Sequence, residues 1–268
     1  KKLVILDSFA LVHRAYYAFP LTLTAQDGTV NNAIYGFLKL TLDVIEKFNP
    51  DYIIATFDSP GKTFRHEMYS QYKSNRGPSD PELTQQISKI EKILLDVGIK
   101  VIKQEGLEAD DIIGSIDNQF SNSGMDTIIV TGDKDMFQLV DDDTKVYLAG
   151  STFSQSQLFD ADAVKDKIGV WPNQVVDLKS LQGDPSDNIP GVAGIGVKSA
   201  IELLTEYKTL DNIYNDIENI KPRYRNKLIS NYEIAKTSYE LAKIAKDFYI
   251  DFDLEKARTD GISSKKLL

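Results

Sequence analysis

Three apolar runs that each end in aspartate organise this chain: LVILD at residues 3–7, YIIATFD at 52–58 and TIIVTGD at 127–133. Short apolar runs of this kind are typical of buried strands in a parallel sheet. Ligands of open α/β sheets bind beyond the carboxyl ends of such strands. We therefore expect the three terminal aspartates to converge on one edge of one sheet.

Two further acidic clusters, EADD and GDPSD, fit the same edge. The predicted set comprises Asp7, Asp58, Glu108, Asp110, Asp111, Asp133, Asp135, Asp184 and Asp187. Taken singly, each aspartate is more often a cap or turn residue, so the prediction rests on the joint pattern. Crowded carboxylates raise one another's pKa unless positive charge lies among them. Two hard divalent cations, Mg²⁺ or Mn²⁺, would supply that charge and suit in-line phosphoryl displacement.

Composition limits the class of protein. A length of 268 residues suits one large domain or two small ones. We see no apolar stretch long enough for a transmembrane helix and expect no signal peptide, because the first residues resemble a core strand. The absence of cysteine excludes disulfides and thiolate metal sites, and it agrees with a cytoplasmic location.

The acidic balance does not exclude nucleic acid as a partner. The net charge is −9, from 31 basic and 40 acidic residues. Setting aside the nine predicted metal ligands brings the remaining net charge to zero. The clustering of basic residues matters more for DNA binding than the total does.

Strand and helix patterns alternate up to about residue 160, and helical segments joined by Gly and Pro turns follow. The first part predicts an α/β fold with a mainly parallel sheet flanked by helices. We expect helices over 33–47, 82–97 and 108–120, and in the KDMFQL segment at 134–139. We place the domain boundary so that residues 1–180 form the α/β core and residues 181–268 form a helical module with a C-terminal tail.

The segment FRHEMYSQYKSNR, residues 64–76, is both basic and aromatic. If it is helical, one face carries Arg65, Tyr69, Tyr72, Lys73 and Arg76. Such a face suits a single nucleic-acid strand, because bases stack on tyrosine rings while cations hold phosphates. The alternative is a charged helix that packs its tyrosines on the core.

The segment PGVAGIGVKSA, residues 190–200, resembles a helix–hairpin–helix turn. Gly194 and Gly196 would let the backbone approach a phosphate, and Lys198 and Ser199 begin the helix whose free N–H groups face the anion. This contact does not depend on base sequence. The basic segment KPRYRNKL, residues 221–228, is either an extension of that duplex contact or a solvated helix end.

On these residues the chain resembles the 5′-nuclease family, in particular the N-terminal 5′→3′ exonuclease domain of bacterial DNA polymerase I. The resemblance rests on VILD, FDSPGKTFRHEMYSQYKSNRGP, GLEADDIIG, VTGDKDMFQLV and LQGDPSDNIPGVAGIGVKSA, which together run over nearly the whole chain. It implies a PIN-like nuclease core, a helical arch at about residues 60–80 and a C-terminal helix–three-turn–helix module.

The resemblance also implies roles for particular residues. One metal ion would be held by Asp7, Asp58, Glu108, Asp110 and Asp111, and the other by Asp133, Asp135, Asp184 and Asp187. Residues implied to bind DNA from the arch are Arg65, Tyr72, Lys73 and Arg76. Those assigned to catalysis are Lys73, Arg76, Asp133 and Asp135. A K⁺ ion would bridge duplex phosphate to backbone carbonyls between Val192 and Ile195.

The resulting hypothesis is a structure-selective, Mg²⁺- or Mn²⁺-dependent 5′ nuclease. Its expected partner is DNA with a 5′ flap or a 5′ end at a duplex junction, with RNA primer–DNA as a further candidate. We expect a monomer that binds no membrane. A polymerase fused to the C-terminus in the native chain is a further candidate partner, which the sequence does not decide. Two alternatives are a PIN-type single-strand ribonuclease and a non-catalytic DNA-binding module of a polymerase.

Overall fold

The computed structural model describes residues 1–77, 80–121, 123–150 and 155–262. Residues 78 and 79 of the predicted arch and residues 263–268 of the predicted C-terminal tail lie outside these ranges.

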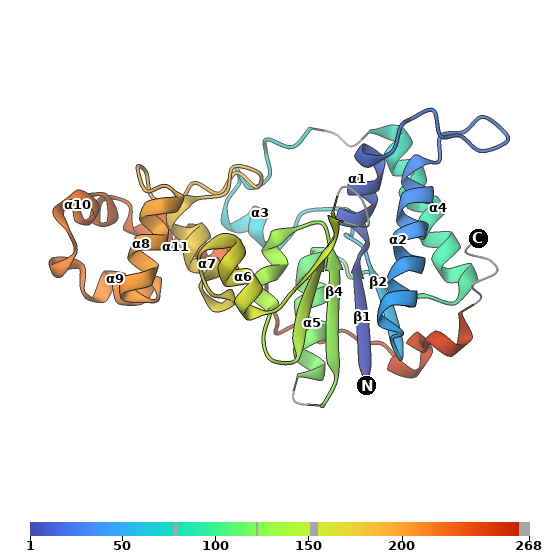
Figure 1. The fold of residues 1–268 in the computed structure, drawn as a ribbon. Coiled ribbons are helices and arrows are strands. Elements are labelled where there is room, and N and C mark those ends of the chain that lie inside the picture. Colours follow the sequence, from blue (N-terminus) through green and yellow to red (C-terminus); the bar gives the residue numbers. More distant parts are fainter. Residues whose placement is uncertain (78–79, 122, 151–154, 263–268) are drawn as a thin grey trace.

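A six-stranded sheet forms the centre of the α/β part (Figure 1). Its strands are β1 (Lys2–Asp7), β2 (Tyr52–Thr56), β3 (Lys100–Ile102), β4 (Asp126–Thr131), β5 (Thr144–Leu148) and β6 (Gln157–Phe159). They are arranged in the order β3-β2-β1-β4-β5-β6, and all neighbours are parallel except β5 and β6. The prediction of a mainly parallel sheet is confirmed. The sequence analysis missed β5 and β6, because their apolar runs, KVYL and QLF, are short.

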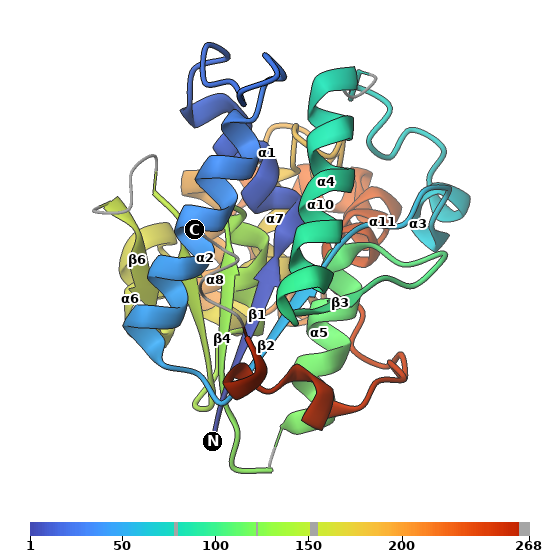
Figure 2. The same ribbon diagram turned by 90° about the vertical axis from the view of Figure 1, so that its right-hand side faces the viewer.

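Helices cover both faces of the sheet, as predicted (Figure 2). On one face lie α1 (Ser8–Ala18), α2 (Asn32–Phe48) and α4 (Pro81–Val97), and on the other lies α5 (Ala109–Phe120). Alternate residues of β1 explain this division, because Val4 and Leu6 pack with the first group, whereas Leu3 and Ile5 pack with α5. Parallel strands buried on both faces need apolar residues at every position, which is why these runs were recognisable.

The second part of the chain is helical and extends from one side of the sheet (Figure 1). Its α-helices are α6 (Ala161–Ile168), α7 (Val175–Gln182), α8 (Val197–Tyr207), α9 (Leu210–Asn215), α10 (Pro222–Ser230) and α11 (Tyr232–Ala242). Short 3₁₀ turns are η1 (Lys134–Leu139), η3 (Pro172–Gln174), η4 (Ile217–Asn219), η5 (Leu254–Ala257) and η6 (Thr259–Gly261). A hydrophobic cluster separate from the two sheet cores, including Leu181, Leu204 and Leu228, holds α7, α8 and α10 together.

Residues 64–76 do not form one continuous helix, so the condition for a shared basic face is not met. The helix α3 (Phe64–Met68) ends after five residues, where Tyr69 is extended. Beyond it, Lys73 has a left-handed backbone with φ of 53°, which no α-helix accommodates. The chain leaves the helix because Arg65 and Tyr72 are drawn into buried contacts with acidic residues. A basic face made of one regular helix therefore does not form in the described part of this segment.

Candidate functional site

The edge of the sheet where β1 and β4 end carries the first two predicted acids. Asp7 is the last residue of β1 and caps α1 by accepting the Ala10 N–H. The Thr131 hydroxyl at the end of β4 donates to Asp7 Oδ2 at 2.5 Å. Asp133 follows two residues later and accepts the Asp135 N–H at 2.9 Å. Because the strand order reverses between β1 and β4, these side chains lie at the switch point where open α/β sheets bind ligands.

The neighbouring strand and α5 bring in three more acids. Asp58 lies two residues beyond β2 and accepts the Ala109 N–H at 2.8 Å. This bond holds the start of α5 against the strand end, so Glu108 and Asp110 lie at the same edge of the sheet. Glu108, Asp110, Asp135 and Asp187 line one narrow gap, which shows that acids distant in sequence converge.

Burial and mutual repulsion shift the pKa values of these carboxylates. Burial raises the pKa of Asp7 to about 7, and the charge of Asp133 adds to the rise. The hydrogen bond from Thr131 lowers the pKa but does not offset the effect of burial. Burial also raises the pKa of Asp110 well above its usual range, and the negative charges of Asp7 and Asp133 contribute. The pKa of Asp58 is raised mainly by burial. Oxygen ligands that repel one another in this way suit a hard divalent cation.

Two cations from residues 64–76 neutralise other members of the acidic set. The Lys73 ammonium lies 2.7 Å from Glu108 and 3.8 Å from Asp187, and Arg76 forms an ion pair with Asp187. Burial opposes ionisation of Glu108, but Lys73 and Arg65 outweigh it and hold the pKa of Glu108 below its ordinary value. Lys73 and Arg76 are thus brought to the acidic edge, as their predicted roles require.

Tyr72 takes a different place from the one predicted. Its side chain is buried, and its hydroxyl lies 3.1 Å from Glu108 and 3.3 Å from Asp187. The ring packs with Ile189 and Leu241. In this conformation the ring presents no free face to a nucleic-acid base.

Arg65 and Asp111 form a buried pair that departs from the predicted roles of both residues. Two guanidinium nitrogens of Arg65 donate to the two oxygens of Asp111 at 2.7 and 2.8 Å. The remaining donors of Arg65 bond the carbonyls of Leu241 and Lys243. Both side chains are buried, at 3% and 0% exposure. In this structure Arg65 therefore does not face DNA, and both Asp111 oxygens are occupied by Arg65 rather than open to a metal.

Lys179, which was not among the predicted residues, lies between two acids of the set. Its ammonium pairs with Asp135 and with Asp184, the latter at 2.5 Å. Burial lowers the pKa of Lys179, but the charges of Asp135 and Asp184 outweigh it and raise the pKa above its ordinary value. The sequence pattern that could have indicated this role is the position of Lys179 in α7, five residues before Asp184.

The fit of the residues to metal ions follows from these contacts. Within the described ranges, no three Asp, Glu or His side chains are placed to hold one ion between them. Lys73, Arg76 and Lys179 instead form ion pairs with four of the carboxylates, Glu108, Asp135, Asp184 and Asp187. The donor set itself fits divalent cations, since Asp7, Asp58 and Asp110 have raised pKa values and no ion-pair partner in the part of the chain that the structure describes.

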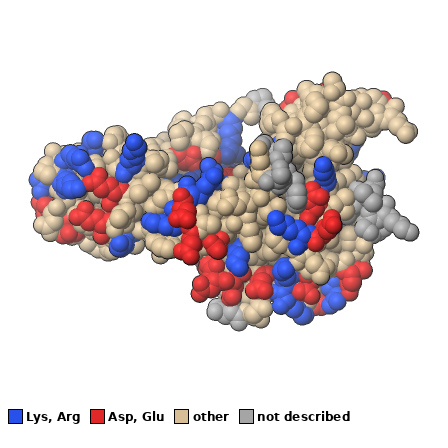
Figure 3. All heavy atoms as spheres, in the orientation of Figure 1, with Lys and Arg blue, Asp and Glu red and all other residues tan. Residues whose placement is uncertain are grey.

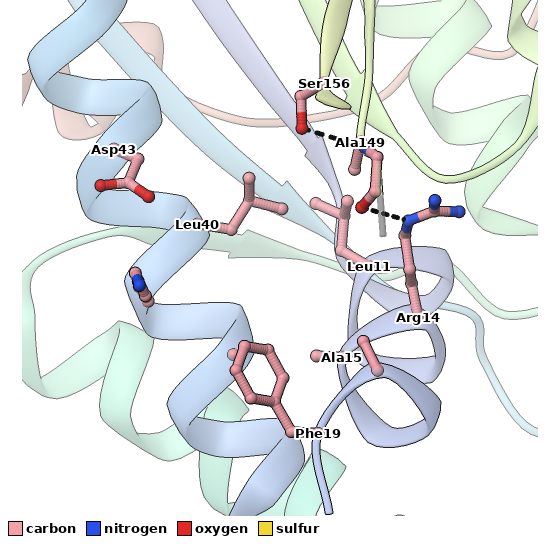
Figure 4. Close-up of a pocket in the computed structure, with 12 residues that line it drawn as sticks. Leu11, Arg14, Ala15, Phe19, Leu40, Asp43, Ala149 and Ser156 are labelled. Carbon is pink, nitrogen blue, oxygen red and sulfur yellow. Dashed lines mark hydrogen bonds between the residues drawn. The ribbon is translucent and has the colours of Figure 1, made fainter. Parts of the chain in front are cut away.

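A cleft of about 620 Å³ opens beside the acidic edge, between the end of β4 and α7. Its charged lining consists of Asp133, Lys134, Asp135, Lys167, Lys179 and Asp184. A separate pocket of about 270 Å³ lies between α1 and α2, where Arg14 donates to the Gly150 carbonyl at 2.9 Å (Figure 4). Because none of the nine acids lines that second pocket, the cleft is the concave surface that belongs to the acidic site.

The hairpin at residues 190–196 contains two glycines with a positive φ. Gly191 and Gly194 adopt left-handed conformations, with φ of 63° and 79°. Gly196 precedes α8 and makes no side-chain cap, so the first N–H groups of α8 have no side-chain acceptor at the cap. Gly194, Gly196 and Lys198 are exposed, whereas Val192 and Ile195 bury their side chains.

Comparison with known proteins gives the family of the chain. Residues 2–169 match the 5′-3′ exonuclease N-terminal resolvase-like domain, and residues 170–265 match the 5′-3′ exonuclease C-terminal SAM fold. This chain belongs to the 5′-3′ exonuclease family. DNA polymerase I of Caldicellulosiruptor bescii is 43% identical over 268 residues, covering 99% of this chain and 31% of the relative. The 5′-3′ exonuclease of Buchnera aphidicola subsp. Schizaphis graminum is 37% identical and covers 100% of this chain and 94% of the relative.

The chain therefore spans less than a third of the DNA polymerase I relative and nearly all of the shorter exonuclease. Solved structures show the same fold. A 5′-exonuclease of bacteriophage T5 with bound zinc has a TM-score of 0.73 at 20% identity, covering 100% of this chain and 96% of that one. The catalytic core of Rad2 in complex with DNA substrate has a TM-score of 0.57 at 18% identity, covering 95% and 80%. No described helix is long and apolar enough to cross a membrane.

Proposed function

We propose that this chain of the 5′-3′ exonuclease family is a divalent-metal-dependent, structure-selective nuclease that cuts DNA phosphodiesters near single-strand/duplex junctions. The observation that carries the proposal is the convergence of Asp7, Asp58 and Asp110 at one sheet edge, where their pKa values are raised. Such an edge is stable with all carboxylates ionised only when positive charge is supplied to it. Family membership makes a phosphodiester the natural substrate.

The residues proposed to hold the ions form two groups. The first is Asp7, Asp58, Glu108 and Asp110, and the second is Asp133, Asp135, Asp184 and Asp187. Divalent ions bound there would lower the pKa of a bound water and stabilise charge on a phosphate. Asp111 is left out of the first group because Arg65 occupies both of its oxygens.

The protein's own cations would act on the phosphate. Lys73 and Arg76 are tied to Glu108 and Asp187 rather than to distant acids, so both lie beside the proposed metal ligands. We infer that they exchange these partners for phosphate oxygens when DNA binds, and that they neutralise the charge that develops in the transition state. For Tyr72, stacking on a base would first require its buried ring to leave the contacts with Ile189 and Leu241.

The cleft and the hairpin would hold the duplex. Lys134 and Lys167 line the cleft and have no ion-pair partner among the residues that the structure describes. The exposed hairpin glycines, with Lys198 and Ser199 at the start of α8, would bind duplex phosphate farther along the helical module. We propose that this functional division falls near residue 180, between the cutting core and the duplex-holding module.

The test compares a 5′-labelled flap duplex with the matching free single strand, each with Mg²⁺ and with EDTA. We expect Mg²⁺-dependent cutting of the flap duplex near its junction and much slower cutting of the free strand. Asp133→Asn should lose the cutting of both substrates. Equal cutting of a single-stranded RNA would favour the PIN-type ribonuclease instead. Tight DNA binding without metal-dependent cutting would favour the non-catalytic module. RNA primer–DNA as substrate, a monomeric state, a cytoplasmic location and a fused polymerase stay predictions.

A further inference from the structure

The basic segment at residues 221–228 contains four cations, and three of them are paired with glutamates. Lys221 and Arg223 both contact Glu202, and Arg225 contacts Glu218. Figure 3 shows basic and acidic side chains intermixed on the helical module. Lys227 differs, because it has no carboxylate partner within the described ranges.

Lys227 instead reaches from α10 to the hairpin. Its ammonium donates to the carbonyl oxygen of Gly194 at 2.8 Å. The side chain lies directly over that residue, since a Cβ added to Gly194 would be 3.1 Å from both Cε and Nζ of Lys227. Gly194 is thus suited to this contact in two ways, by its left-handed φ of 79° and by its lack of a side chain.

This contact conflicts with a potassium ion at the hairpin. The expected K⁺ position is a set of backbone carbonyls between Val192 and Ile195, and the Gly194 carbonyl within that range already accepts an ammonium. A second cation beside Lys227 would be repelled by it. The arrangement therefore does not fit a K⁺ ion while Lys227 is in place.

We propose that the Lys227 ammonium replaces K⁺ at the hairpin, so that this chain binds duplex phosphate there without a monovalent metal ion. The proposal rests on the proposed function for its ligand, a backbone phosphate of duplex DNA. An ammonium has three donors. One is used by Gly194 in the structure, which leaves two for phosphate oxygens. The positive charge then comes from the chain itself.

The matched control is Lys208, which makes the same kind of contact elsewhere in the module. Its ammonium donates to the Thr205 carbonyl at 2.6 Å, at the C-terminal end of α8. The hairpin lies at the other end of that helix. Lys208→Met therefore removes an exposed lysine bound to a carbonyl without touching the hairpin.

The first measurement is flap-duplex affinity in EDTA, which prevents cutting, in KCl and in tetramethylammonium chloride at equal ionic strength. The wild type is expected to bind equally in both salts. Lys227→Met is expected to bind the duplex about tenfold more weakly than wild type in tetramethylammonium chloride and to recover part of that affinity in KCl. The slope of log K against log salt concentration should fall in magnitude by about one unit. Lys227→Arg should stay within about twofold of wild type, because it keeps the charge and a donor. Lys208→Met should match wild type.

The second measurement needs no DNA and compares thermal unfolding in the same two salts. Wild type should show no stabilisation by K⁺ over tetramethylammonium, whereas Lys227→Met should be stabilised by K⁺ at the vacated carbonyl. Selective K⁺ stabilisation of the wild type would overturn the proposal, as would equal behaviour of Lys227→Met and wild type. A protein that binds no DNA in any salt would refute the proposed function, and the unfolding data would still decide the role of Lys227.

Discussion

Arg65 and Asp111, 46 residues apart in the chain, form a buried pair with two hydrogen bonds of 2.7 and 2.8 Å. The Asp111 carboxylate also accepts the Ala245 N–H, and Arg65 bonds the carbonyls of Leu241 and Lys243. The pair therefore connects α3, α5 and the segment after α11. Because both side chains are occupied within the protein, we expect these two residues to stabilise the site rather than to contact a ligand.

Replacing Arg65 with Met is expected to lower the free energy of unfolding by about 3–5 kcal/mol, because Asp111 would be left buried and unpaired. Urea denaturation without metal measures this loss. The control is Arg76→Met, which breaks a half-exposed ion pair and should cost about 1 kcal/mol or less. If Arg65→Met were as stable as wild type and lost only DNA affinity, the DNA-binding role predicted from the sequence would be correct.

Lys179→Met is expected to destabilise the metal-free protein by about 3 kcal/mol, since Asp135 and Asp184 would face each other without a counter-ion. Added Mg²⁺ should recover much of the loss by supplying the missing charge. Thermal unfolding in EDTA and in Mg²⁺ tests this. Lys167→Met, which lines the same cleft and has no ion-pair partner in the described ranges, should change little in either condition. An equal loss with and without Mg²⁺ would argue against a metal near these acids.

Lys73→Ala is expected to lower kcat by about 10²–10³-fold with a small change in KM, because a charge that neutralises the transition state contributes little to ground-state binding. Steady-state kinetics on the flap duplex separates the two constants. Lys62→Ala removes an exposed lysine nearby and serves as the control. A rise in KM alone would mean that Lys73 only binds DNA.

Asp117 offers a pH prediction at the far end of α5. Burial raises its pKa from 3.8 to about 6, although the Thr144 hydroxyl donates to it at 2.6 Å. Because the folded pKa exceeds the unfolded one, protonation favours folding. Asp117 therefore destabilises the protein above about pH 6, and the penalty disappears towards pH 4.

Asp117→Asn should accordingly raise the free energy of unfolding by about 1–3 kcal/mol at pH 8, with the gain vanishing near pH 4. Urea denaturation of wild type and Asp117→Asn in EDTA, between pH 4 and pH 8, measures the difference in their free energies of unfolding. Groups that titrate in the same way in the two proteins do not contribute to this difference. Asp126→Asn, at an exposed position at the start of β4, is the control for removal of a surface charge. A gain in the free energy of unfolding that does not change with pH would mean that the buried charge of Asp117 does not destabilise the folded protein.

Much of the fold could be predicted from the sequence because the strands and helices of the α/β part have local patterns of apolar residues. The segments LVIL at residues 3–6 and IIV at 128–130 are apolar at consecutive positions, as strands buried on both faces require. The helices at 32–48 and 81–97 were found within one residue of their limits for a similar reason, since each carries an amphipathic period. The segment 64–76 has an equally clear period, yet long-range contacts of Arg65 and Tyr72 override it.

By itself, the sequence determined that acids follow parallel strands and therefore meet at one edge, because strand direction alone places a residue at that edge. It could not determine which charges lie between those acids. Lys179 between Asp135 and Asp184, Arg65 on Asp111, and Lys227 on Gly194 join residues from separate helices and turns. Only the packing of α3, α7 and α10 sets those distances, and electrostatic pairing of buried groups depends on distance and desolvation rather than on residue type.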